Sequence, residues 1–128
     1  MAFTATANTV IDDSNTNSID FTPFCVSVDV DDASGCEAIK AGVASTCMAV
    51  KKISIICDAN ITVTIGAGET GGAVTTKILG PIPFTAEGGQ VTHEFINPIK
   101  IAANTSLTVD ASGAGNLGII VEGYTFAG

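Results

Sequence analysis

The sequence predicts an all-β protein, an antiparallel β-sandwich for which a jelly roll is one candidate topology, with an extended N-terminal arm. Three observations support this fold class. Apolar and polar residues alternate in short runs, turn residues recur roughly every 8 to 12 residues, and no stretch has the apolar period of a helix. At 128 residues, with 46% hydrophobic and 14% charged residues, the chain is expected to form one folded domain.

The chain divides into a polar arm, residues 1–20, and a sandwich domain, residues 21–128. The arm is rich in Thr, Asn, Asp and Ser, and we expect it to become ordered by docking on another surface. The first strand is "FTPFCVSVDV", residues 21–30, in which Phe24, Val26 and Val28 alternate with polar or small residues. The segment "DDASG" that follows consists largely of residue types that favour turns, so we expect the strand to end there.

Two further segments are expected to form pairs of strands. "CEAIKAGVASTCMAV" is interpreted as strand, turn, strand, because Gly42, Val43 and its Ser and Thr residues are poor helix formers. In "KKISIICDANITVTIG" the apolar residues 53, 55 and 57 share one face, and 61, 63 and 65 share another. The short "DAN" turn between these runs predicts a β-hairpin.

The glycine-rich segment "GAGETGGAV" is expected to be a hairpin tip. It has neither the Walker pattern nor a following helix, so a phosphate site is not indicated. In "LGPIPFTAEGGQVTHEF", Pro81 and Pro83 cannot donate to a ladder, which indicates a sheet edge or a link between sheets. His93, the single histidine, is interpreted as a packed or interface residue and not as a catalytic one.

The final strand is apolar on both sides, whereas the strand before it is apolar on one side. Leu107 and Val109 are expected to point inward, and Thr108 outward. In the final strand one face holds residues 117, 119 and 121, and the other holds Ile120, Tyr124 and Phe126. A strand of this kind is covered on both faces, by its own sandwich and by a neighbouring subunit. The candidate interface residues are Phe3, Val10, Ile11, Ile120, Tyr124 and Phe126.

The charge distribution argues against several partners. The net charge is −8, and the five basic residues are all lysines. Seven acidic residues precede Lys40, and no basic residue does. Nucleic acid and anionic membranes need clustered basic residues, so both are rejected as direct partners. No signal peptide or membrane-spanning run is recognised, and synthesis in the cytoplasm is expected.

No chemistry is predicted from the remaining polar residues. Asp29 and Asp31 open a calcium-loop pattern, but Ala33 and Lys40 stand where ligands are needed. The cysteines lack the close pairs of a zinc site. We expect reduced thiols, while a disulfide among Cys25, Cys36 and Cys47 stays open. We therefore predict no catalytic residues, no metal, no cofactor and no enzyme activity.

Residues from about 40 to 126 resemble small tailed-phage capsid decoration (cement) proteins. The resemblance rests on "KKISIICDANITVTIG", "ILGPIPFTAEGGQVTHEF" and "NPIKIAANTSLTVDASGAGNLGIIVEGY", in that order. It implies a β-sandwich made in the host cytoplasm that binds the major capsid protein on the outside of a phage head, as a homo-oligomer with a trimer favoured. A receptor-binding or fibre module of a phage particle, an extracellular filament or surface-layer subunit, and a carbohydrate-binding sandwich remain alternatives.

Overall fold

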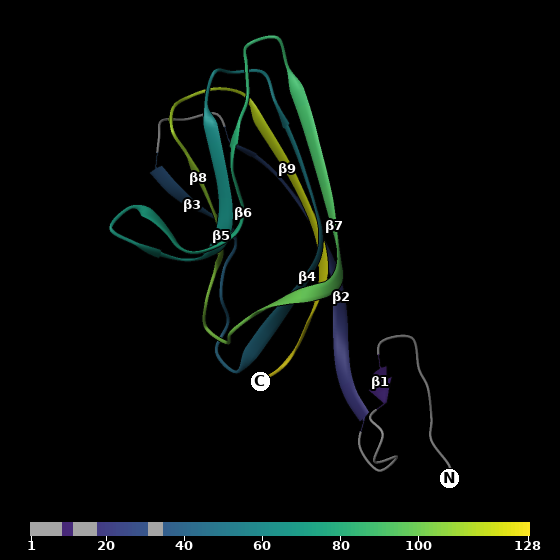
Figure 1. The fold of residues 1–128 in the computed structure, drawn as a ribbon. Coiled ribbons are helices and arrows are strands. Elements are labelled where there is room, and N and C mark those ends of the chain that lie inside the picture. The colour runs from purple at the N-terminus through teal and green to yellow at the C-terminus, as the bar shows by residue number, and fades with distance from the viewer. Residues whose placement is uncertain (1–8, 12–17, 31–34) are drawn as a thin grey trace.

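The computed structural model describes residues 9–11, 18–30 and 35–128, and these form two packed antiparallel β-sheets (Figure 1). One sheet has the strand order β1-β2-β9-β4-β7 and the other the order β3-β8-β5-β6. No helix long and apolar enough to span a membrane occurs in these ranges. The strands are β1 (Thr9–Ile11), β2 (Ser18–Val30), β3 (Gly35–Lys40), β4 (Thr46–Cys57), β5 (Thr62–Thr70), β6 (Ala73–Pro83), β7 (Gly89–Ile101), β8 (Leu107–Ala111) and β9 (Leu117–Ala127).

The strand pairs are nested within one another along the chain. β5 pairs with β6, β4 with β7, β3 with β8 and β2 with β9, all antiparallel. β9 also pairs with β4, and β8 with β5, which joins the nested pairs into sheets. The predicted antiparallel β-sandwich is confirmed, and β2 begins at Ser18, three residues before the expected start of the first strand.

The core lies between the two sheets and is almost entirely aliphatic. Its largest side chains are fully enclosed, because alternate residues of each strand face the opposite sheet. Phe84, in the segment that leads into β7, closes one end and is 8% exposed. The buried cluster consists of Ile39, Met48, Val50, Ile53, Ile55, Cys57, Ile61, Val63, Ile65, Phe84, Ile101, Leu107, Val109, Ala111, Leu117, Ile119 and Val121.

The hairpin predicted for residues 51–66 is wrong, although both of its strands exist. β4 belongs to the five-stranded sheet and β5 to the four-stranded sheet, so the intervening turn crosses the sandwich. Ile53 and Val63 are both 0% exposed and lie on opposite walls of the core. An alternating run can bury its apolar face either as a neighbour of the other run in one sheet or as part of the opposite sheet. The alternation is the same in both arrangements, so it cannot distinguish a hairpin from a crossing between sheets.

Other local predictions are confirmed. Residues 35–40 and 46–57 form two strands joined by a turn in which Ser45 has φ 59°. The glycine-rich segment is the β5–β6 hairpin tip, and Gly71 and Gly72 there have positive φ (61° and 79°). β6, which contains Pro81 and Pro83, is an edge strand of its sheet.

Thr108 is a second correction, because the alternation places it on a solvent-facing side and the structure buries it. Its side chain is only 3% exposed. Its hydroxyl donates to the carbonyl oxygens of Gly66 and Gly68, at 3.3 and 2.9 Å. The β5 backbone therefore satisfies this polar group, which a strand pattern alone does not reveal.

Candidate interaction surface

The outer face of the five-stranded sheet carries exposed aliphatic side chains. Directly opposed residues of neighbouring strands share a face of the sheet, and the register aligns Ser27, Ile120, Ser54 and Thr92 in one row. The hydroxyl groups of Ser54 and Thr92 are 3.2 Å apart on this face. Ile120 in the centre of the row is 41% exposed. The predicted apolar second face of the last strand thus lies on the outside of the sandwich.

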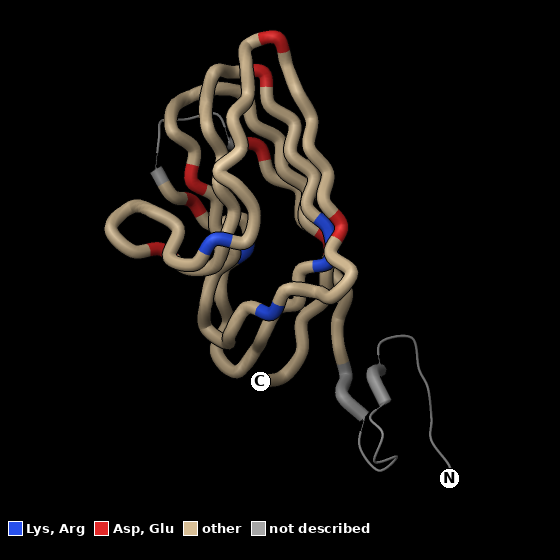
Figure 2. The backbone as a smooth tube through the Cα atoms, viewed as in Figure 1, with Lys and Arg blue, Asp and Glu red and all other residues tan. Residues whose placement is uncertain are grey.

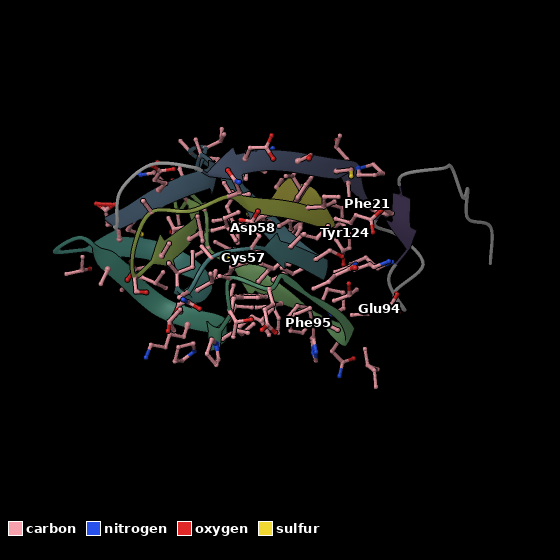
Figure 3. The ribbon with its side chains drawn as sticks, turned by 90° about the horizontal axis from the view of Figure 1, so that it is seen from above. Phe21, Cys57, Asp58, Glu94, Phe95 and Tyr124 are labelled. Carbon is pink, nitrogen blue, oxygen red and sulfur yellow. The ribbon has the colours of Figure 1, made fainter. Side chains whose placement is uncertain are left out.

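An aromatic group covers the other end of this outer face. The rings of Phe21 and Tyr124 are 4.8 Å apart, and those of Tyr124 and Phe126 are 6.1 Å apart. The ammonium group of Lys100 lies 6.0 Å from the centre of the Phe126 ring. Figure 3 shows Phe21 and Tyr124 at the same end of the sandwich. The three rings are half-buried, and each keeps part of its surface in contact with solvent.

The structure brings together three of the predicted interface residues. Ile120, Tyr124 and Phe126 are separated by even intervals in β9, so they project from the same side of that strand. Val10 and Ile11 lie in β1, opposite Ile19 and Ser18 of β2, and their side chains are outside what the structure describes. Phe3 lies outside the described residues. The interface role of all six residues stays a prediction.

Sequence reasoning missed two exposed isoleucines. Ile56 is 55% exposed and Ile96 is 97% exposed. Ile56 could have been found, since it interrupts the alternation of Ile53, Ile55 and Cys57 with an apolar residue on the polar side. Ile96 carries no such signal, because its exposure results from an irregularity in the pairing of β4 with β7.

The four cysteines are free thiols in very different surroundings. Cys25 on β2 is exposed, Cys36 on β3 is half-buried, and Cys47 and Cys57 are buried. Cys25 and Cys36 belong to different sheets. The structure describes all four as unpaired, and the disulfide among Cys25, Cys36 and Cys47 stays an open prediction.

The surroundings of Cys36 oppose ionisation of its thiol. Partial burial raises the pKa of Cys36 above its ordinary value, since a thiolate is less well solvated there. The carboxylates of Glu69 and Asp110 raise this pKa further, and a hydrogen bond with Thr108 lowers it. The thiolate is the nucleophilic form of cysteine, so Cys36 should be a poor nucleophile.

The cysteines are therefore expected to react with iodoacetamide in a defined order at pH 8. Cys25 should be alkylated first because it is exposed, and Cys36 more slowly because its thiolate is disfavoured and half-covered. Cys47 and Cys57 should react only after unfolding. Mass spectrometry of peptides taken during the reaction measures each rate, and a Cys36 rate equal to that of Cys25 would contradict the described burial.

His93 lies at the margin of the sandwich and contacts an aromatic side chain. It is exposed on the edge strand β7, and its ring is 4.6 Å from that of Phe95 in an edge-to-face arrangement. A cavity of about 720 Å³ lies elsewhere and is lined mainly by small and hydroxyl-bearing residues of β5, β6, β8 and the β7–β8 loop. Within residues 9–11, 18–30 and 35–128, no cluster of His, Cys, Asp and Glu is arranged to hold a metal.

Comparison with known proteins gives likenesses of fold at low identity. No protein-family model and no curated protein matches the sequence. A capsid structure of Helicobacter pylori bacteriophage KHP30 is 15% identical, with 82% of this chain and 87% of that chain covered and a TM-score of 0.48. A structure of Bacillus endospore appendages, described as disulfide-linked pili, is 13% identical, with 99% and 98% covered and a TM-score of 0.44.

A pentameric capsid protein from metagenomic phage sequences is 17% identical, with a TM-score of 0.33. The match covers 80% of this chain and 61% of that one. At these levels the resemblance concerns the course of the chain, and no function follows from it.

Proposed function

We propose that this chain is a structural subunit that works by associating with copies of itself and with a larger particle. The observation that carries the proposal is the outer face of the five-stranded sheet. Ile56 and Ile120 are exposed on it, although the core between the sheets is already complete. Apolar side chains on a sheet face that is not needed for the core favour burial against another protein surface.

Among structural roles, we place the chain as a decoration (cement) protein on the outside of a tailed-phage head, bound to the major capsid protein and assembled as a trimer. The sequence resemblance supports this role. The structure also explains why glycine and tyrosine stand at positions 123 and 124, the terminal "GY" motif of that resemblance. A side chain at Gly123 would collide with the Ala49 carbonyl oxygen and lie 3.2 Å from the Phe24 ring. The adjacent Tyr124 belongs to the aromatic group on the outer face.

Replacing Ile120 with aspartate is expected to weaken self-association at least tenfold. The change puts a charge on the outer face between Ser27 and Ser54, where contact with another copy would bury it, and burying an unpaired charge is strongly unfavourable. Folding should be preserved, since this side chain is 41% exposed. Sedimentation velocity over a range of concentrations measures the effect. Ile120→Val keeps an apolar side chain and should associate like the unmodified chain; equal association by the aspartate variant would count against this surface.

The location and copy number of the chain in purified particles test the finer role. A decoration protein should be present in many copies spread symmetrically over the shell. A few copies confined to a vertex or the tail tip would instead identify a receptor-binding or fibre module. Absence from phage particles would reject both roles.

An extracellular filament subunit is the second candidate, and the exposed thiol of Cys25 favours it. This thiol lies on the outer face of the five-stranded sheet, in the same row as Glu122. A thiol so placed is accessible to a cysteine of another copy in an oxidising environment. Non-reducing mass spectrometry of purified assemblies separates the candidates: cross-linked peptides between copies would support a filament, and fully reduced thiols would oppose it.

A further inference from the structure

An irregularity in β7 produces an exposed apolar projection on the edge of the five-stranded sheet. Val50 pairs with Ile99 and Lys52 with Glu94, so residues 95–98 of β7 lie opposite the single residue Lys51. The excess residues bulge out of the ladder, and Figure 1 shows the sharp change in direction of β7. Ile96 lies in this bulge and is 97% exposed. Bulges of this kind re-aim side chains away from the sheet.

A pocket with an apolar wall that could receive Ile96 lies toward the other end of the same sheet. It has a volume of about 520 Å³ and is lined by residues of β2, β4, β9 and the loops that follow β4 and precede β9. Ile56 forms an apolar wall, and Gly118 leaves space above the backbone. The carboxylates of Asp29 and Asp58 are also in the lining, and Asn116 donates a hydrogen bond to Asp58 at 3.3 Å.

The charge of Lys51 beside the bulge is opposite to that of the pocket, although Glu94, the partner of Lys52, borders the bulge as well. Lys51, opposite the bulge that bears Ile96, is exposed. The pocket contains two aspartates and no lysine. In Figure 2 the described lysines lie around the lower half of the body, where acidic residues also lie, and the upper end carries acidic residues and no lysine. The Ile96 side chain could therefore pack against Ile56 in the pocket while the Lys51 ammonium group is attracted to the pocket carboxylates.

We propose that Ile96 of one copy of this chain enters the Ile56 pocket of the next copy, with Lys51 placed against Asp29 and Asp58. The inference rests on the proposed self-association and names the contact that produces it. The projection and the pocket are different surfaces of one chain, so the contact is head-to-tail. Such contacts close into a ring, a trimer included, when the rotation per copy allows, and otherwise continue into a filament.

A mixing experiment tests this contact directly. Ile96→Asp removes the apolar projection, and Ile56→Asp places a charge in the wall of the pocket. Neither variant alone should form assemblies. A 1:1 mixture should give heterodimers and nothing larger, because each variant retains the half that the other lacks. Native mass spectrometry counts the copies. Val43→Asp is the matched control, since Val43 is 56% exposed away from both features, and it should assemble like the unmodified chain.

Charge exchange provides an independent measurement on the same contact. Lys51→Glu and Asp58→Lys should each weaken association about tenfold, and the chain carrying both changes should recover most of it, since opposite charges face each other again. Thermal unfolding of every variant verifies that the fold is retained.

The outcomes separate the contact from the wider proposal. Undiminished assembly by folded Ile96→Asp, or failure of the mixture to give heterodimers, would overturn the head-to-tail contact and leave self-association standing. An unmodified chain that stays monomeric at every concentration would overturn both.

Discussion

Replacing Ile53 with alanine is expected to lower the free energy of unfolding by about 2–5 kcal/mol. Ile53 is 0% exposed in the centre of β4, where its neighbours across the ladder are Val121 of β9 and His93 of β7. Deleting three carbon atoms there removes buried apolar contact and leaves a cavity that the packed sheets cannot fully close. Chemical denaturation with urea, compared with the unmodified chain, measures the difference.

Ile56 provides the matched control on the same strand. Its side chain is 55% exposed, so Ile56→Ala should change the free energy of unfolding by about 0.5 kcal/mol or less. The two variants should also differ in assembly, because only Ile56 belongs to the proposed pocket. A loss of stability as large at position 56 as at position 53 would contradict the assignment of inner and outer faces in β4.

Replacing Gly66 with alanine is the second change with a large expected effect. A methyl group there would collide with the carbonyl oxygen of Thr76 and the side chain of Val74, both on the partner strand β6. Backbone atoms held in a ladder cannot move aside without breaking the pairing of β5 with β6. A loss of about 1–3 kcal/mol is expected from such overpacking. Differential scanning calorimetry should show a lower unfolding temperature.

Gly118→Ala serves as the comparison for this prediction. A methyl group at Gly118 would find its nearest atom, Oδ1 of Asp29, at 3.7 Å, which is an ordinary contact. Its φ is not positive, so alanine should be tolerated and stability should change little or rise slightly. If both glycine variants unfold at the same temperature, the close approach of β5 and β6 at Gly66 is not as described.

The proposed function separates two tasks between the two sides of the five-stranded sheet. The inner side is committed to the core, and variants such as Ile53→Ala should affect folding first. The outer side holds Ile120, Tyr124 and Phe126, and changes there should affect association with little cost to the fold. This division makes the assembly properties accessible to mutation without loss of the folded chain.

The sequence by itself determined most of the strands from residue 21 onward and which of their residues are apolar, but it did not predict β1 within the polar arm. The two prolines located the edge strand β6, because proline cannot donate within a ladder. Adjacent glycines located the hairpin tip, where Gly71 and Gly72 adopt positive φ. Apolar residues on both sides of β9 indicated a second hydrophobic face. These features are local, since each depends on the chemistry of a few consecutive residues.

Only the tertiary structure decided which strands lie side by side and which face each other. β4 and β5 have the alternation of a hairpin and belong to different sheets. Thr108 is buried under backbone carbonyls of β5, and Ile96 is exposed because four residues of β7 oppose one of β4. The alternation of apolar and polar residues shows how many faces of a strand are apolar. Register and sheet membership depend instead on how segments distant in the sequence pack together, and no single stretch of the chain contains that information.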